Sequence, residues 1–271
     1  MREPDSARDL ARANLYRYLC LAPLPPSDPR FGLLRDPGFR SLVVAAADWI
    51  RADATFHPPK LGPGEIHPAE LDPTSLLPGE DDIDRSYWQV FGHSVSKDCP
   101  PYENEYYANH DVTFRSERLS DVAGFYRAFG LDRSGAVRER IDHLTFEAEF
   151  LQIVIARQLY AADQGLDEAH VEVCRQAQRS FFIEHFGWWL PAFGVQLESR
   201  SNCSFYKGLG RFVRGFAASE RAVLEIPPFT ELPTAHADSF EAEGTCFECA
   251  LAPESSSATR LGPVGPEGPA V

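Results

Sequence analysis

The sequence predicts an all-α fold, and three observations support this prediction. Apolar residues recur at steps of three and four along most of the chain, which is the period of an α-helix. No stretch of useful length alternates between apolar and polar residues, as a half-buried strand would. The stretch 138–165 carries apolar side chains around nearly its whole circumference, which is typical of a helix packed on all sides by other helices. We therefore expect a single-domain helical bundle organised around this central helix.

The periodic stretches predict seven helices, several of them with clear stop signals. The first ends at the proline cluster 23–29, because proline lacks the backbone N–H that a helix interior needs. Ser120 caps a helix near the middle of the chain and Gly130 ends it. Pro191 is expected to end the sixth helix. The expected ranges are 5–21, 37–54, 81–92, 120–131, 138–165, 167–190 and 202–224.

Two segments lack the helical pattern. Between 56 and 80 prolines and glycines recur without periodic apolar residues, so we expect a long surface loop or insertion. From 226 onward the chain is rich in Pro, Gly, Ser and Glu, and such a composition buries too little apolar surface to offset the entropy of ordering. The expected organisation is one helical domain over 1–225, with a proline-rich insertion at about 56–80, and a largely mobile tail over 226–271.

Charge and cysteine content narrow the classes of function. The formal net charge is −14, from 40 acidic and 26 basic residues, which argues against nucleic acid or an anionic membrane as the partner. The first residues carry charges of both signs where a secretion signal would be basic and then apolar, and no run approaches the ~20 apolar residues that cross a bilayer. We expect a cytoplasmic protein that does not insert into membranes, with its six cysteines as reduced thiols.

Asp142 and His143 stand side by side where the central helix begins. An Asp suits this end of a helix, because the unpaired N–H groups and the macrodipole favour negative charge there. One interpretation is therefore structural: Asp142 stabilises the first helical turn and His143 is a partly buried histidine satisfied by its neighbours. The other interpretation is functional and depends on a wider set of motifs.

Three motifs follow one another in the sequence: CPPYENEYY at 99–107, DVAGFYRAFGL at 121–131 and RIDHLTFEAEFL at 140–151. In this order and spacing they resemble the TorD/DmsD/NarJ-like family, the cytoplasmic chaperones for molybdenum oxidoreductases. The resemblance covers roughly residues 6–225, apart from the insertion. It implies a TorD-like helical bundle that is not an enzyme and holds no cofactor. Its partner would be the catalytic subunit of an oxidoreductase of the dimethyl sulfoxide reductase family, bound through the twin-arginine leader until molybdopterin is loaded. The CPPYE form resembles chaperones of the dimethyl-sulfide/ethylbenzene dehydrogenase and selenate/chlorate reductase group.

The resemblance also implies a leader-binding surface. The family's Asp-His pair corresponds to Asp142 and His143, and its aromatic residue after the proline pair corresponds to Tyr102, where many relatives carry Trp. A basic leader with an apolar segment calls for carboxylates and an apolar trough. The expected peptide-binding residues are Asp142, His143, Tyr102, the apolar pair Val90 and Phe91, the acidic Glu103 and Glu105, Leu144, and Tyr18 or, in its place, Tyr16 from the first helix.

A metal-dependent helical enzyme is one alternative. His143 and Glu147 lie four residues apart, as two ligands on one helix face would. A di-metal bundle needs a matching pair on other helices, and the neighbouring Glu184 and His185 do not have that spacing.

A metal-binding adaptor is the other alternative, because Cys246 and Cys249 form a CxxC motif. Structural zinc takes four ligands, and only His236 lies nearby in sequence. A nucleotide enzyme finds no support, since the GLGRFVRG stretch at 208–215 lacks the Gly-Lys-Ser/Thr of a P-loop.

Overall fold

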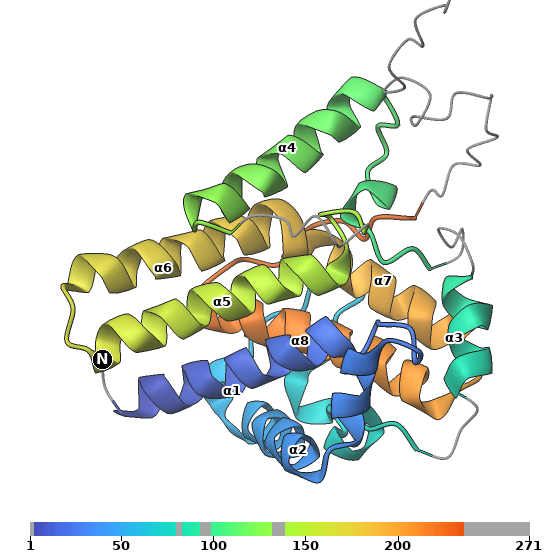
Figure 1. Ribbon diagram of the computed structural model, residues 1–271, viewed down its shortest axis with the longest axis horizontal. Coiled ribbons are helices and arrows are strands. Elements are labelled where there is room, and N and C mark those ends of the chain that lie inside the picture. Colours follow the sequence, from blue (N-terminus) through green and yellow to red (C-terminus); the bar gives the residue numbers. More distant parts are fainter. Residues whose placement is uncertain (1–2, 80–82, 93–98, 132–138, 236–271) are drawn as a thin grey trace, which may run out of the picture. The chain divides into compact units, whose positions relative to one another are not determined.

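The computed structural model describes residues 3–79, 83–92, 99–131 and 139–235, and there the chain is all-α, as predicted (Figure 1). The described residues form eight α-helices: α1 (Glu3–Leu21), α2 (Pro37–Ala52), α3 (Ile83–Phe91), α4 (Val112–Ala128), α5 (Leu144–Asp163), α6 (Glu168–Phe181), α7 (Gly187–Arg200) and α8 (Ser204–Val223). Among these helices, none is both long and apolar enough to span a bilayer.

Helix α5 is the centre of the packing, as its apolar circumference predicts. Helices α1 and α6 run along it, and α7 packs against α8 (Figure 1). Leu151, Val154 and Ile155 of α5 are fully buried. The helix begins later than expected, at Leu144, because the residues before it turn away to pair with another segment.

A buried polar network also ties α1 to the other central helices. The guanidinium of Arg12 on α1 donates to both carboxylate oxygens of Glu220 on α8, each at 2.8 Å. It also donates to Asp9 and to Gln178 on α6, and Gln158 on α5 donates to Asp9 at 2.7 Å. Each group in this set has a partner, as buried polar groups require. The network joins α1, α5, α6 and α8.

The expectation that Pro191 ends a helix is wrong. Helix α6 stops at Phe181, a π-helical turn covers Phe182–Phe186, and α7 then runs through Pro191 to Arg200. A proline inside a helix costs about 3 kcal/mol. Full burial of Trp189 and Phe193, on either side of it, offsets this cost.

The helix expected at 120–131 begins earlier than predicted. Helix α4 starts at Val112, because Asp111 accepts hydrogen bonds from the backbone N–H groups of Thr113 and Phe114 and so acts as its N-cap. Ser120 lies within the helix. Gly130, at φ +62°, follows the end of the helix as predicted. Only Val122 of α4 is buried, so this helix is the least embedded of those around the core.

The proline-rich segment is more than a surface loop. Its described part folds into short 3₁₀ turns that pack on α2 and α8 through Phe56, Leu71 and Leu76, all nearly or fully buried. Glu65 forms a buried ion pair with Arg221 of α8 at 2.6 Å. Of the expected tail, residues 226–235 are described; 236–271, with His236, Cys246 and Cys249, lie outside the described residues.

Candidate functional site

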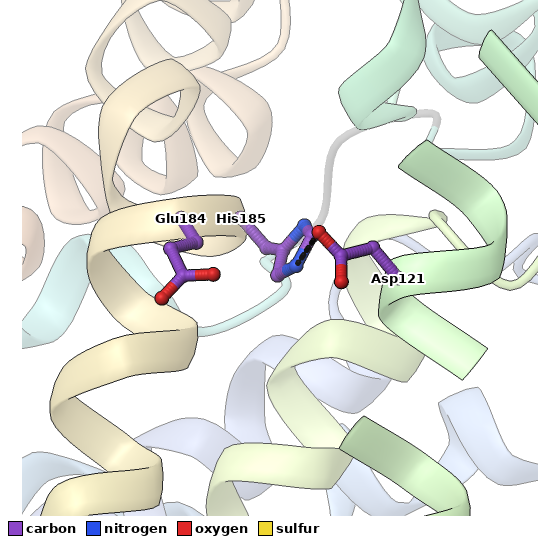
Figure 2. A group of neighbouring side chains, drawn as sticks. All are labelled: Asp121, Glu184 and His185. Atoms are coloured by element: carbon purple, nitrogen blue, oxygen red, sulfur yellow. Dashed lines mark ion pairs between the residues drawn. The ribbon is translucent and has the colours of Figure 1, made fainter. Parts of the chain in front are cut away.

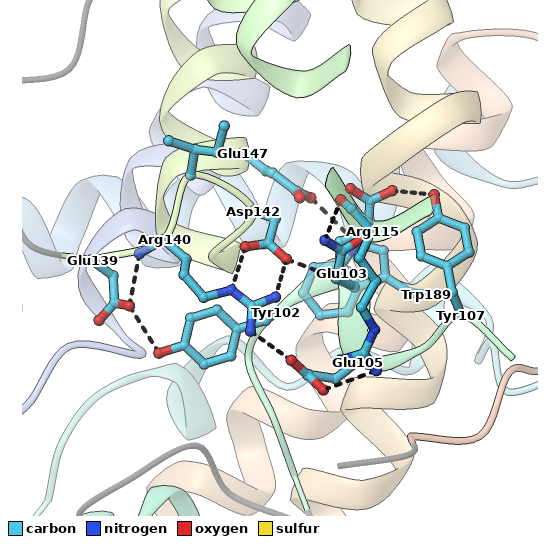
Figure 3. A network of polar contacts seen from close by, with 12 residues as sticks. Tyr102, Glu103, Glu105, Tyr107, Arg115, Glu139, Arg140, Asp142, Glu147 and Trp189 are labelled. Carbon is cyan, nitrogen blue, oxygen red and sulfur yellow. Dashed lines mark hydrogen bonds and ion pairs between the residues drawn. The ribbon is translucent and has the colours of Figure 1, made fainter. Parts of the chain in front are cut away.

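The 99–107 motif and the start of the central helix come together in the fold (Figure 3). The backbone N–H of Glu103 donates to the carbonyl of Asp142 at 3.0 Å, and that of Leu144 donates to Pro101 at 2.9 Å. Tyr102 and His143 thereby form an isolated antiparallel bridge. The prolines keep this turn extended, which lets its backbone pair with the residues before α5. Two motifs some forty residues apart thus become one site.

Arg140 occupies the middle of this site. Its Nη2 lies 2.6 Å from Oδ2 of Asp142, its Nε lies 3.0 Å from Oδ1, and its Nη1 lies 2.6 Å from Oε1 of Glu105. The guanidinium also lies over the ring of Tyr102, 4.6 Å from the centroid, as a cation–π contact. Burial opposes its charge, but the two carboxylates outweigh burial and raise the pKa of Arg140. The site is a receptor for a guanidinium, filled by the chain's own arginine (Figure 3).

The two carboxylates are covered rather than open to solvent. Asp142 is fully buried and Glu105 is 5% exposed, whereas the side chain of Arg140 keeps 34% of its surface. Asp142 also accepts the backbone N–H of Asn104 at 3.1 Å. The sequence predicts that both acids face a partner, and Arg140 is not among the predicted site residues. The sequence does contain a signal for this pair, because Arg140 lies two residues before Asp142 in the RIDHL motif and an arginine so close to an acid can pair with it.

His143 is the N-cap of α5. Its Nδ1 accepts the backbone N–H of Thr145 at 3.1 Å, which satisfies one of the unpaired donors of the first turn. The cap requires an unprotonated Nδ1. Burial lowers the pKa of His143 to about 4, although Glu139 and Asp142 act in the opposite direction. The capping role assigned to this pair therefore falls on His143, one residue later than expected, and on a neutral ring.

Two further acids lie deeper. Glu103 is fully buried and accepts from Tyr107 at 2.7 Å and from Trp188 at 3.2 Å. Glu147, a candidate metal ligand in the sequence, is also fully buried and accepts a hydrogen bond from the indole N–H of Trp189 at 3.3 Å. Burial, together with the nearby charge of Glu103, raises the pKa of Glu147 well above its ordinary value. Burial and this neighbouring charge therefore favour the neutral, protonated form of Glu147.

Comparisons with known proteins bear on these motifs. The sequence profile of the family described as "Nitrate reductase delta subunit" matches residues 70–194, which include both halves of the site. The chain is 32% identical over 91 residues to the perchlorate reductase assembly chaperone protein of Dechloromonas aromatica, covering 34% of this chain and 39% of that protein. It is 36% identical over 116 residues to the selenate reductase assembly chaperone protein of Thauera selenatis, covering 42% and 58%. Against the chaperone protein TorD of Photobacterium profundum, the identity is 25% over 124 residues, covering 46% and 55%.

Over the matched region, the chain is similar to the nitrate reductase delta subunit family and to reductase assembly chaperones. The matched segments span about two fifths to three fifths of the length of these curated relatives. The relatives are named as assembly chaperones or chaperones, and none of these names describes a catalyst.

The apolar residues expected at the family's leader-binding surface lie in the core. Phe91 and Val90 are 5% and 3% exposed, and Phe91 packs edge-on against Tyr206 of α8. Leu144 and Tyr18 are fully buried, and Tyr18 packs edge-on against Phe212. In this protein the accessible part of the expected surface is therefore centred on Tyr102 and Arg140.

Proposed function

We propose that this protein is an assembly chaperone. It would bind the apo-form of the catalytic subunit of a molybdenum oxidoreductase of the dimethyl sulfoxide reductase family, in the cytoplasm, through that subunit's twin-arginine leader. The names of the relatives support the chaperone role, since they are described as assembling perchlorate, selenate and chlorate reductases. Because the matched region contains the Tyr102 and Asp142 motifs, the similarity includes the residues that would do the binding.

The guanidinium receptor around Arg140 is the observation that carries the leader-binding proposal. A bidentate carboxylate, a second acid and an aromatic face together are the partners that an arginine prefers. A leader arginine would take the place of Arg140 on Asp142 and Glu105. Arg140 can leave toward solvent because a third of its side chain is already exposed, whereas the two acids are anchored in the body of the protein.

The exchange explains why a receptor for an external arginine would be filled in the free protein. An uncompensated buried carboxylate is costly, so the empty site would be unstable without an internal cation. Arg140 supplies that cation while no leader is bound. Such an internal competitor lowers the affinity for the leader and leaves the selectivity for arginine intact, because both occupants need the same fork geometry.

Removing the competitor tests the proposal. In Arg140→Gln we expect the affinity for a synthetic twin-arginine leader peptide, measured by calorimetric titration, to rise about fivefold. This is the effect of removing a partly exposed ion pair worth about 1 kcal/mol. The same peptide with its arginine pair replaced by lysines should bind both proteins weakly, since lysine cannot form the bidentate pair.

The matched control is Arg51→Gln, which breaks an exposed Arg–Asp pair on α2 and should leave leader affinity unchanged. Equal or weaker binding in Arg140→Gln, with circular dichroism showing that the variant is folded, would contradict the exchange. If the wild-type protein binds no twin-arginine peptide but retains the apo catalytic subunit in a pull-down, the leader is not the recognised element, while the chaperone role stands.

A further inference from the structure

Asp121, Glu184 and His185 gather at a second site, beyond the guanidinium receptor (Figure 2). Asp121 lies on α4, and Glu184 and His185 lie in the π-helical turn between α6 and α7. Each offers one ligand atom, and these atoms lie within 4.8 Å of one another. We propose that these three side chains bind a divalent transition metal ion of the zinc type.

The state of His185 points to a ligand. The side chain is fully buried, and its Nδ1 lies 3.2 Å from both carboxylate oxygens of Glu103. Glu103 accepts two further hydrogen bonds, from Tyr107 and Trp188, so its carboxylate is the acceptor and Nδ1 carries the proton. The remaining nitrogen, Nε2, is therefore a bare lone pair. It is buried and has no hydrogen-bond partner among the described residues.

This lone pair is aimed at the two acids. Nε2 lies 3.9 Å from Oδ2 of Asp121, too far for a hydrogen bond but suited to an ion between the two atoms. The arrangement of carboxylate, histidine and metal is the usual one for metal-bound histidines, in which the second nitrogen donates to an acid that orients the ring. Glu103 would be the orienting acid. Phe125 and Phe181 hold the imidazole from two sides, with ring centroids 5.5 and 5.1 Å away.

The spacing of the ligand atoms fits a small ion after a modest closure. Bonds of about 2.1 Å around a tetrahedral ion place its ligand atoms about 3.4 Å apart, so the two acids must move inward by on the order of 1 Å. They can do so because the side chain of Asp121 is 42% exposed and Glu184 is exposed. Only the histidine is fixed. One nitrogen and two oxygens favour zinc, manganese or iron over magnesium, and leave a position for water.

Two features of the surroundings agree with this assignment. The π-helical turn is an uncommon element that often marks functional positions, and here it carries two neighbouring ligands. The adjacent residues Glu184 and His185 do not have the spacing of a di-metal helical bundle. A single ion does not need that spacing, because Asp121 of α4 supplies the third ligand. Arg118 lies 3.5 Å from Asp121 and would have to release that oxygen.

The ion would anchor α4. Val122 is the buried residue of this helix, and the half-buried Phe125 and Tyr126 pack against Phe150 and Phe181, so the contacts of α4 with the body of the protein are mainly aromatic. A metal ion would bridge Asp121 of α4 to His185 of the π-helical turn. His185 in turn contacts Glu103, the residue after Tyr102, so α4 would be linked to the guanidinium receptor. Metal binding should therefore slow amide hydrogen exchange in α4.

The test uses the full chain with Cys246→Ser and Cys249→Ser, so that the CxxC motif cannot supply zinc ligands. After chelator treatment the protein is titrated with Zn²⁺ by calorimetry and with Co²⁺ by visible absorption. We expect one ion per chain and increased amide protection in α4. Magnesium should bind much more weakly than zinc, since it does not favour imidazole.

Three variants decide whether the ion is at this site. Glu184→Gln and Asp121→Asn change exposed groups, so both should fold, and each should weaken Zn²⁺ binding by about tenfold or more. Glu168→Gln, an exposed acid at the start of α6, is the matched control and should bind as the parent does. Unchanged Zn²⁺ affinity in both Glu184→Gln and Asp121→Asn would overturn the proposal. So would the absence of stoichiometric Zn²⁺ binding, in which case His185 serves only as an internal contact between Glu103 and Asp121.

Discussion

The capping histidine His143 and the buried acid Glu147 are the residues whose shifted pKa values should make stability depend on pH. Glu103, Glu147 and Asp142 are fully buried within one small region, and nearby donors, which include Arg140, compensate them unequally. Asp142 is paired with a guanidinium, whereas Glu147 accepts the indole N–H of Trp189. An unpaired charge is costly in a low-dielectric interior, so burial favours the protonated form of Glu147. Two substitutions test this at the level of residues.

We expect His143→Asn to remove part of the protein's acid sensitivity. The pKa of His143 falls to about 4 in the folded state, from 6.5 when unfolded, so between these values the unfolded chain binds more protons. Stability is therefore fully present above pH 6.5 and is lost as the pH falls toward 4, by up to about 3 kcal/mol from this group. Asn still caps the helix but does not titrate. Urea unfolding at pH 7 and pH 5 should give a smaller difference for the variant; equal differences would contradict the assignment.

Glu147→Gln should stabilise the protein, and more so at higher pH. The raised pKa means that the folded state keeps a proton that the unfolded chain releases above about pH 4.5, so wild-type stability declines as the pH rises through the interval between those two pKa values. Glutamine matches the shape of the neutral acid and does not titrate. Glu147→Ala is the contrast, since it leaves a cavity and should lose about 1–3 kcal/mol. Denaturant midpoints at pH 5 and pH 8 give the comparison, and a Gln variant less stable at both would count against a neutral Glu147.

At the level of elements, helix α7 depends on very close contact with α8. A Cβ on Gly194 would lie 2.6 Å from the carbonyl oxygen of Gly210 and 2.6 Å from a methyl of Val213. The two helix backbones therefore touch at these glycines. The same helix contains Pro191, so two residues that usually weaken a helix are retained because of what they allow in packing. Intrinsic propensity is overridden here by tertiary contact.

Gly194→Ala should destabilise the protein by about 1–3 kcal/mol, because overpacking at this crossing outweighs the gain in helix propensity. The matched control is Gly124→Ala within α4, where no atom lies within 4 Å of the added Cβ. That change should stabilise by up to about 1 kcal/mol, the difference in helix propensity. Chemical denaturation of both variants measures the effect. Similar changes in the two would show that the helices can move apart at no cost.

For the molecule as a whole, buried ion pairs connect segments that are distant in sequence. Arg12 of α1 pairs with Glu220 of α8, and the next residue, Arg221, pairs with Glu65 of the proline-rich segment. Neighbouring residues of α8 thus hold the N-terminal helix and the 56–79 segment. Arg221 also donates to the carbonyl of Ile226, so the start of the C-terminal segment is held at the same place.

Glu65→Ala should destabilise the protein by about 3–5 kcal/mol, since it leaves the guanidinium of Arg221 buried without its acid. Glu70→Ala, an exposed acid of the same segment, is the control and should change stability by less than about 0.5 kcal/mol. Unfolding free energy and limited proteolysis of the 56–79 segment are the measurements. Loss of protease resistance in both variants alike would mean that the ion pair does not hold the segment.

The sequence alone was sufficient for the all-α class, for the central position of α5 and for the ranges of α2 and α8. These depend on apolar residues three and four positions apart, and such patterns report on a face that each helix must bury. The family resemblance, rather than any pattern in the residues, implied that the motifs of Tyr102 and Asp142 share one surface. Where a helix began or ended was less predictable, because Asp111 and His143 became caps through local geometry and Pro191 was tolerated through burial.

Only the tertiary structure decided the partners of the charged groups. Arg140 meets Glu105 across 35 residues, and His185 meets Glu103 across 82. The spacing of apolar residues in the sequence does not predict such pairs, because the free energy of a buried charge depends on the groups that lie beside it in the folded protein. For the same reason the sequence predicted that Asp142 binds an arginine of a partner, whereas in the folded protein Asp142 pairs with Arg140 of the same chain.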